Sequence, residues 1–233
     1  MSGVPAGCEA PAAVHPHAFS PAERAAVYRA MALRRDMRHF LPDPLDDATL
    51  RRLLWAAHAA PSVGHMQPWR LLRVTDPAVR AALRADVEAE RLATAQALGA
   101  RGGEFLHVKV HGLDACPELW VAALADGREA HLFGRRTLPE MDLASVACAL
   151  QNLWLAARAE GVGMGWVSLF DPDTVSAAVH LPPGARPVAL ICLGRVPAFY
   201  DQPLLVQADW APTLAPDAVM FENTWGSPAL WLR

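Results

Sequence analysis

Three arginines and one aspartate crowd the end of the first expected helix. Arg34, Arg35 and Arg38 lie within five residues of one another, and Asp36 lies among them. Guanidinium groups bind phosphate and carboxylate through charge-assisted, often bidentate hydrogen bonds, so the cluster could clamp a phosphorylated ligand. A carboxylate among three guanidiniums should stay ionised, which suits an ion pair and an acid–base group equally well. The alternative is a solvated basic helix end that complements the helix dipole.

A second set of polar side chains lies in a short loop bracketed by two prolines. The segment 61–68 contains Ser62, His65 and Gln67. Hydrogen-bonding side chains beside open backbone can grip the edge of a polar heterocycle. The same composition also fits an ordinary loop between a helix and a strand.

A glycine-rich turn forms the third feature, with Gly161, Gly163 and Gly165 at alternate positions and Ser168 after them. The G-x-G-x-G spacing differs from the dinucleotide fingerprint, and the turn ends a helix where that motif opens one. The glycines can instead let backbone approach a flat ligand, or simply form a tight turn. Ser168 lacks the G-x-S-x-G context of a hydrolase nucleophile.

The composition of the 233 residues argues against several functional classes. A net charge of −3 argues against a nucleic-acid partner, and no apolar run reaches the roughly 18 residues of a membrane helix. The four cysteines form no C-x-x-C pair, and His107 and His111 lack the glutamate of H-E-x-x-H, so no metal site is expected. The N-terminus lacks a basic region followed by an apolar stretch, so we expect no signal peptide and a reducing, cytoplasmic location.

Helices and strands alternate along the chain and must position these residues. Residues 1–19 lack periodicity and are expected to form a mobile tail. The helix over about 139–160 is nearly all apolar and is therefore expected to be buried. Other helices are expected over about 20–33, 46–60 and 76–98, and strands over 69–74, 119–124, 165–170 and 188–194. This order predicts an α+β or mixed α/β domain around one sheet.

Together, these segments resemble the nitroreductase-like flavoprotein superfamily. An arginine-rich helix end, a P-S-x-x-x-x-Q-P-W loop and a G-x-G strand entry are the flavin-binding pieces of that superfamily. The resemblance implies an α+β fold with a central mixed β-sheet and a buried helix. It implies an FMN domain over residues 20–226, a C-terminal tail over 227–233, and a homodimer with two flavin sites at its interface. The matching segments are residues 34–40, 60–70, 134–143, 151–161, 165–172 and 222–226.

Asp36 indicates one branch of this superfamily. Ordinary nitroreductases usually carry serine where this chain has Asp36 and asparagine where it has His65. The aspartate is typical of a branch that consumes its flavin. The resemblance implies that reduced FMN and dioxygen give 5,6-dimethylbenzimidazole, the lower ligand of cobalamin, and erythrose 4-phosphate, with no metal. It implies a separate flavin reductase as a partner.

Two alternatives on the same fold remain open. One is an NAD(P)H-dependent nitroreductase or flavin reductase, which would keep its FMN through turnover. The other is a non-catalytic flavin-binding protein.

The resemblance also implies roles for individual residues. The arginines would hold the phosphate or a ring carbonyl of the flavin, and Asp36 would accept a proton as ribityl bonds break. Ser168 would hydrogen-bond to the flavin. The stretch over about 100–136 is a lid candidate that would exclude water. The implied catalytic residues are Asp36 and Ser168, and the implied flavin-binding residues are Arg34, Arg35, Asp36, Met37, Arg38, Ser62, Gln67, Gly165, Ser168 and Arg195.

Overall fold

The computed structural model describes residues 15–232. The tail expected over residues 1–19 therefore lies mostly outside the described residues. The chain divides into two compact units, Met1–Asp201 and Gln202–Arg233. The first unit contains α1 (Pro21–Leu33), α2 (Asp47–His58), β1 (Trp69–Arg73), α3 (Pro77–Ala97), α4 (Gly102–His107), β2 (Glu118–Leu124), α5 (Met141–Ala159), β3 (Gly163–Val167), α6 (Pro172–Ala178) and β4 (Arg186–Gly194).

One four-stranded sheet organises the first unit. Its strand order is β1-β2-β4-β3, and all three strand pairs are antiparallel. The sheet was expected to be mixed, and its parallel component is a single bridge between Asp36 and Met164. All seven residues of β2 are buried, including Glu118 at its start. The predicted α+β class is confirmed.

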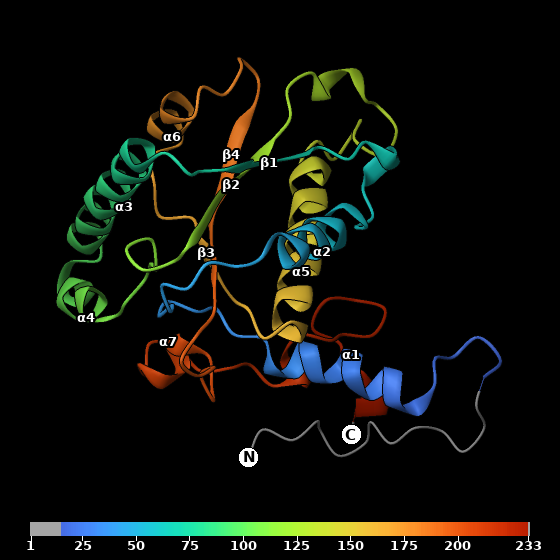
Figure 1. Cartoon of the computed structure of the whole chain (residues 1–233). Helices are drawn as coiled ribbons and strands as arrows, with labels where there is room; N and C mark the ends of the chain where they lie inside the picture. The colour runs from blue at the N-terminus through green and yellow to red at the C-terminus, as the bar shows by residue number, and fades with distance from the viewer. Residues whose placement is uncertain (1–14, 233) are drawn as a thin grey trace. The chain divides into compact units, whose positions relative to one another are not determined.

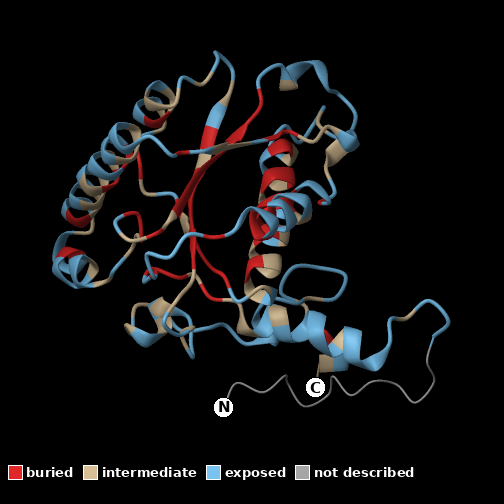
Figure 2. Cartoon of the chain, in the orientation of Figure 1, coloured by how far each residue is buried: buried red, intermediate tan, exposed pale blue. Residues whose placement is uncertain are grey.

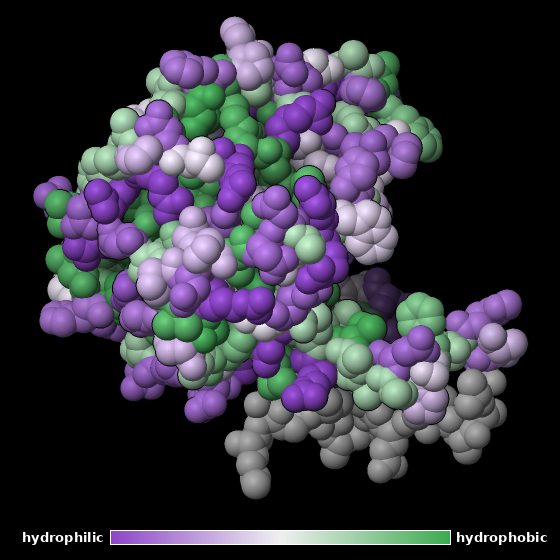
Figure 3. Space-filling model, viewed as in Figure 1, coloured by the Kyte–Doolittle hydropathy of each residue, from purple (hydrophilic) through white to green (hydrophobic). Residues whose placement is uncertain are grey.

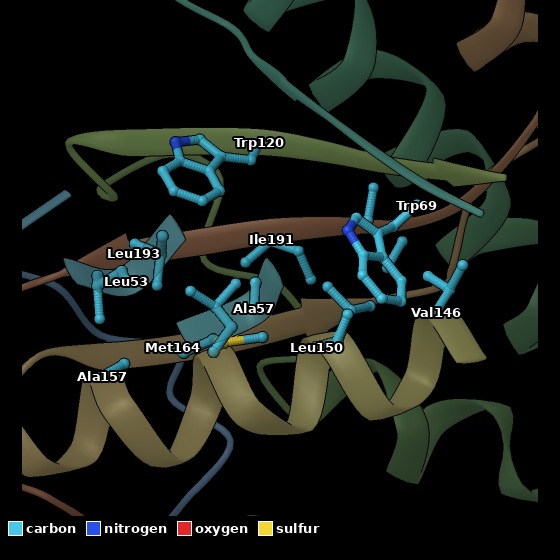
Figure 4. Close-up of a cluster of buried hydrophobic side chains, with 14 of the residues drawn as sticks. Leu53, Ala57, Trp69, Trp120, Val146, Leu150, Ala157, Met164, Ile191 and Leu193 are labelled. Carbon is cyan, nitrogen blue, oxygen red and sulfur yellow. The ribbon is translucent and has the colours of Figure 1, made fainter. Parts of the chain in front are cut away.

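Helices cover both faces of the sheet (Figure 1). α2 and α5 pack on one face, where Leu53, Leu150 and Ile191 belong to one buried cluster (Figure 4). α3 and α6 pack on the other face around Leu83 and Val175.

Buried residues follow the strands and the inner side of α5 (Figure 2). The predicted burial of that helix is confirmed for this side only, because Leu143, Cys148 and Gln151 are exposed. No described helix is long and apolar enough to cross a membrane.

α1 differs from the other long helices of this unit. Its start was predicted correctly, because Ser20 and Glu23 form a reciprocal capping box and Pro21 takes the first helical position. None of its residues is buried, and Val27, Tyr28 and Met31 are exposed. The space-filling view shows apolar residues at the surface over this helix (Figure 3). α1 therefore presents apolar surface that the first unit leaves uncovered.

The lid candidate over residues 100–136 is not one segment. β2 lies inside it and is a central, fully buried strand, so the lid prediction is wrong for that part. The loop after β2 is fastened to the start of α5, where the buried carboxylate of Asp142 accepts hydrogen bonds from Arg128 and Arg135. Between these two arginines the loop exposes Leu132 and Phe133.

The second unit is small and consists mainly of turns. It contains α7 (Leu204–Gln207), two 3-10 turns and an isolated bridge between Phe221 and Pro228. Among its described residues only Ala229 is buried. The segment 222–226, which contributed to the resemblance, lies here.

Candidate functional site

The chain that leaves α1 lies along the outer edge of β3. The backbone N–H of Met37 donates to the carbonyl of Met164 at 2.9 Å, and the Met37 side chain is fully buried. A Cβ atom on Gly165 would collide with the Met37 carbonyl, and one on Gly163 would press against the Met37 side chain. Gly163 and Gly165 are therefore required by the close approach of two protein segments, whereas Gly161 has a positive φ of 68° just after α5 and no close neighbour among the described residues.

Asp36 and Arg38 form a bidentate ion pair at this edge. Arg38 Nη1 lies 2.5 Å from Asp36 Oδ1, and Nη2 lies 2.6 Å from Oδ2. The backbone N–H of Trp166 also donates to Oδ1 at 3.0 Å. Arg38 is buried, whereas the Asp36 side chain is 39% exposed. The carboxylate is thus held in one orientation with one side open.

Arg35 is occupied within the chain as well. Its Nη1 donates to the carbonyls of Ala32 and Arg34, and its Nη2 donates to the carbonyl of Asp201 at 2.8 Å. The clustering of three arginines within five residues had suggested one phosphate clamp. The structure instead gives Arg35 and Arg38 internal partners, which the sequence pattern could not show.

Arg34 is the member of the cluster that remains available. Its guanidinium carbon lies 4.5 Å from the centroid of the Trp154 ring, a cation–π contact. Burial lowers the pKa of Arg34, the negative charge of Asp36 raises it, and the charge of Arg35 lowers it again. Among the described residues, Arg34 has neither a hydrogen-bonded nor an ion-paired side-chain partner. A half-buried guanidinium without such a partner suits an anionic ligand.

Ser168 and Arg195 mark the two ends of the same edge. Ser168 follows β3 and is exposed, while Arg195 follows β4 beside Gly163, which pairs with Gly194. Arg195 Nη1 donates to the carbonyl of Glu160 at 2.7 Å. Five residues of strand separate Gly163 from Ser168, which corresponds to about 16 Å. The edge is long enough for an extended ligand with a charged end.

The loop 61–68 lies at the opposite edge of the sheet. Ser62 Oγ accepts a hydrogen bond from the backbone N–H of Gln67 at 2.9 Å, and Ser145 Oγ accepts one from Val63 at 3.0 Å. Gly64, His65 and Gln67 have φ values of 53°, 53° and 50°. Left-handed backbone at non-glycine residues is strained and is often found at functional sites.

One chain does not bring all the predicted residues together. The loop 61–68 leads into β1, and β1 and β3 are the two outer strands. Three strand spacings separate them, which is about 14 Å. Arg34, Asp36, Gly165, Ser168 and Arg195 therefore share one edge, and Ser62 and Gln67 lie at the other.

Sequence reasoning missed three aromatic residues that support the Asp36 edge. Trp154 Nε1 donates to the carbonyl of Arg35 at 3.1 Å, and the Trp154 and Trp166 rings lie 6.3 Å apart. Tyr200 Oη accepts from the backbone N–H of Arg38 at 3.2 Å and lies 2.6 Å from His39 Nδ1. Burial raises the pKa of Tyr200. Two of them could have been found from the sequence, because Trp154 and Trp166 lie in the segments 151–161 and 165–172 that carry the family resemblance.

No group of three or more His, Cys, Asp or Glu side chains among residues 15–232 could hold a metal ion. The candidate site consists of guanidinium, carboxylate, hydroxyl and indole groups. These groups bind and orient an organic anion more readily than a metal.

Solved structures of other proteins share this fold. Nitroreductase A from Vibrio parahaemolyticus superposes with a TM-score of 0.67 at 20% identity, covering 88% of this chain and 78% of its own. Oxidised iodotyrosine deiodinase bound to FMN and 3-iodo-L-tyrosine superposes with a TM-score of 0.63 at 22% identity, covering 85% and 98%. At these identities the similarity shows a shared fold.

The chain belongs to the nitroreductase family, which matches residues 31–195. A 5,6-dimethylbenzimidazole synthase from Rhodobacter capsulatus is 41% identical over 199 residues, covering 84% of this chain and 96% of that protein. A protein of the same name from Rhodospirillum rubrum is 40% identical over 195 residues, covering 82% and 92%. An NADH dehydrogenase from Thermus thermophilus is 31% identical over 178 residues, covering 69% and 82%.

Proposed function

We propose that this protein makes 5,6-dimethylbenzimidazole, the lower ligand of cobalamin, from reduced FMN and dioxygen, with erythrose 4-phosphate as the other product. The observation that carries the proposal is the similarity to two 5,6-dimethylbenzimidazole synthases, at 41% and 40% identity over more than nine-tenths of their lengths. The aspartate at position 36, held open toward solvent at the β3 edge, supports the same reaction.

The residues of the β3 edge fit a flavin mononucleotide. Arg34 offers a half-buried guanidinium to the phosphate or to a ring carbonyl, and Arg195 is a second basic group close to this edge. Met37 and Gly165 are buried and shape the edge from behind, whereas Ser168 contributes an exposed hydroxyl. Arg35 and Arg38 would act indirectly, because their hydrogen bonds position Arg34 and Asp36. When bound, reduced FMN supplies both the electrons for dioxygen and the carbon atoms of the benzimidazole.

Asp36 is the proposed proton acceptor, and its two oxygens differ. Oδ1 accepts hydrogen bonds from Arg38 Nη1 and the Trp166 backbone, whereas Oδ2 accepts one from Arg38 Nη2. We assign proton transfer to Oδ2, which has more lone-pair capacity left. Arg38 holds this oxygen in place and Ser168 orients the ligand, since a hydroxyl donates well but is a poor base.

A homodimer is part of this proposal. Ser62 and Gln67 lie at the edge opposite Asp36, so a second copy could supply its loop 61–68 to complete the site. The uncovered apolar residues of α1 and the 72% exposed Trp55 of α2 also suit an interface between copies. Sedimentation should therefore show a dimer.

A separate flavin reductase is the proposed source of reduced FMN. The turn at Gly161–Gly165 is not a dinucleotide-binding motif, so direct use of NAD(P)H is not expected. A reducing, cytoplasmic location would fit this proposal, because FMN must reach the protein in its reduced form.

The similarity to the Thermus NADH dehydrogenase favours a second candidate, an NAD(P)H-dependent nitroreductase or flavin reductase. That protein would oxidise NAD(P)H and retain intact FMN. A storage protein would retain flavin without consuming NAD(P)H.

One experiment separates these functions. The protein is incubated in air with chemically reduced FMN, without NAD(P)H, and the products are analysed by mass spectrometry. We expect loss of flavin and appearance of 5,6-dimethylbenzimidazole, which require intact Asp36. Full recovery of FMN together with rapid NADH oxidation in a parallel assay would establish the reductase instead.

A further inference from the structure

One tryptophan of α5 contacts both parts of the β3 edge. Trp154 follows the buried Leu153, and its partly buried side chain packs against the apolar cluster between this helix and the sheet. The guanidinium carbon of Arg34 lies over its ring, 4.5 Å from the centroid. Among the described residues no hydrogen bond or ion pair holds the Arg34 side chain, so the ring is the contact that restrains it.

The same ring lies beside the strand that holds Asp36. The centroids of the Trp154 and Trp166 rings are 6.3 Å apart, with an angle of 31° between the ring planes. This separation is within the range of interacting aromatic pairs. The backbone N–H of Trp166 donates to Asp36 Oδ1 at 3.0 Å. Trp154 therefore contacts both the available guanidinium and the residue that orients the carboxylate.

The indole N–H of Trp154 has a separate role. Its Nε1 donates to the carbonyl of Arg35 at 3.1 Å. One turn further along α5, Arg158 Nε donates to the carbonyl of Leu33 at 3.0 Å. Leu33 ends α1, and the last carbonyls of a helix lack partners within the helix. The N–H of Trp154 thus helps to anchor the backbone after α1, whereas its ring contacts the side chain of Arg34.

An arginine that is held by a ring can still bind an anion. The five N–H donors of a guanidinium lie in its plane, and a ring contact uses its face. Arg34 therefore keeps its donors for a ligand while its long side chain is restrained. A side chain that is already ordered loses less rotamer freedom when a ligand binds, which strengthens binding.

We propose that Trp154 is a positioning residue for ligand binding. Its ring holds the Arg34 guanidinium ready for the anionic or carbonyl group of the ligand, on the edge where Asp36 is oriented. Trp154 acts through Arg34. The identity of the ligand as reduced FMN rests on the proposed function, whereas the position of Arg34 in the free protein does not.

Two substitutions separate the ring from the N–H. Trp154→Phe keeps an aromatic face and removes the N–H, whereas Trp154→Met removes both and keeps an adaptable apolar side chain. In anaerobic titrations with reduced FMN, we expect Trp154→Met to weaken binding by about three- to tenfold and Trp154→Phe to retain most of the affinity. Equal weakening in both variants would assign the effect to the hydrogen bond with Arg35 and would overturn the proposal, as would unchanged binding in both.

A double-mutant cycle tests whether Trp154 acts through Arg34. In the Arg34→Ala background, Trp154→Met should weaken binding by less than about twofold more, because residues that act as one unit are not additive. Full additivity would contradict the proposal. Arg158→Met is the matched control, since it removes the neighbouring anchor of α1 and should leave FMN affinity nearly unchanged. A loss as large as that of Trp154→Met would mean that a loosened end of α1 explains both results.

The free protein provides a test that needs no flavin. Protons that lie over an aromatic ring resonate upfield in NMR spectra, and Arg34→Lys identifies the resonances of Arg34. These should lie upfield in the wild type and in Trp154→Phe, and should move to ordinary arginine positions in Trp154→Met. Ordinary positions in the wild type would refute the proposal. If the wild type binds no FMN, the proposed function fails, and the spectra still decide whether the ring holds Arg34.

Discussion

The two outer strands of the sheet carry the two parts of the candidate site, and the two parts are built differently. At the β3 edge, Asp36 and Arg38 are tied to each other and to the backbone of Trp166. At the β1 edge, the loop 61–68 is held by the hydroxyls of Ser62 and Ser145 and has left-handed backbone at three positions. The first part is preorganised by charged hydrogen bonds, whereas the second stores backbone strain.

A second contrast lies within the β3 edge. Arg38 is buried and bidentate to Asp36, whereas Arg34 rests on Trp154 with its polar atoms available. Residues of the same type, four positions apart, should therefore differ in what they support. We expect Arg38 to stabilise the folded edge and Arg34 to stabilise the bound ligand.

The largest effect is expected at Asp36. Asp36→Asn keeps the shape and removes the base, so product yield should fall by about 100- to 10,000-fold while reduced FMN still binds. Product analysis and flavin titration are done on the same variant, with Ser168→Ala as the milder comparison. A product yield near wild type at saturating reduced FMN would eliminate the base role and leave Asp36 as a partner of Arg38.

Arg38→Met should lower the free energy of unfolding by about 2–3 kcal/mol, because it leaves the partly buried Asp36 carboxylate without its charged partner. Urea unfolding measures the change. Arg34→Met is the matched control, and it should lose less than about 0.5 kcal/mol because Arg34 has no comparable bond to lose. Equal losses in both variants would remove the distinction between the two arginines.

Arg34→Ala should weaken FMN binding by about 1.5–3 kcal/mol, the range for a charge-assisted hydrogen bond. Riboflavin lacks the phosphate, so a parallel titration with riboflavin distinguishes a contact of Arg34 with the phosphate from a contact with a ring carbonyl. Equal weakening for both flavins would indicate a ring carbonyl, and unchanged titration of both would mean that Arg34 is a solvated helix end.

The smallest effect is expected in the loop 61–68. Gly64→Ala should cost about 1–2 kcal/mol of stability for left-handed backbone, and its Cβ would also lie 3.0 Å from the carbonyl oxygen of Phe133. Gly127→Ala is the matched control, because Gly127 has φ 64° and no atom within 4 Å of its added Cβ. Thermal unfolding should show a larger loss for Gly64→Ala, and equal losses would mean that the Phe133 contact is irrelevant.

The elements were predictable where local chemistry decides them. The helix over about 20–33, the strand over 119–124 and the apolar helix over about 139–160 were each predicted as the correct element. Boundaries were less accurate, since β3 begins at Gly163 and not at Gly165. Two of its first three residues are glycines, which carry no strand-like side-chain pattern, and pairing with β4 makes this segment a strand.

The sequence by itself determined the kinds of chemistry available to this protein: guanidinium groups beside one carboxylate, a polar loop between prolines, and glycines at alternate positions. Only the tertiary structure decided how these groups are used. It paired Arg38 with Asp36, turned Arg35 toward carbonyls, placed Arg34 on Trp154, and packed Gly163 and Gly165 closely against Met37. It also separated Ser62 from Asp36 by the width of the sheet. The physical reason is that hydrogen-bond partners and strand order depend on contacts between residues far apart in the chain, which residue type and spacing do not specify.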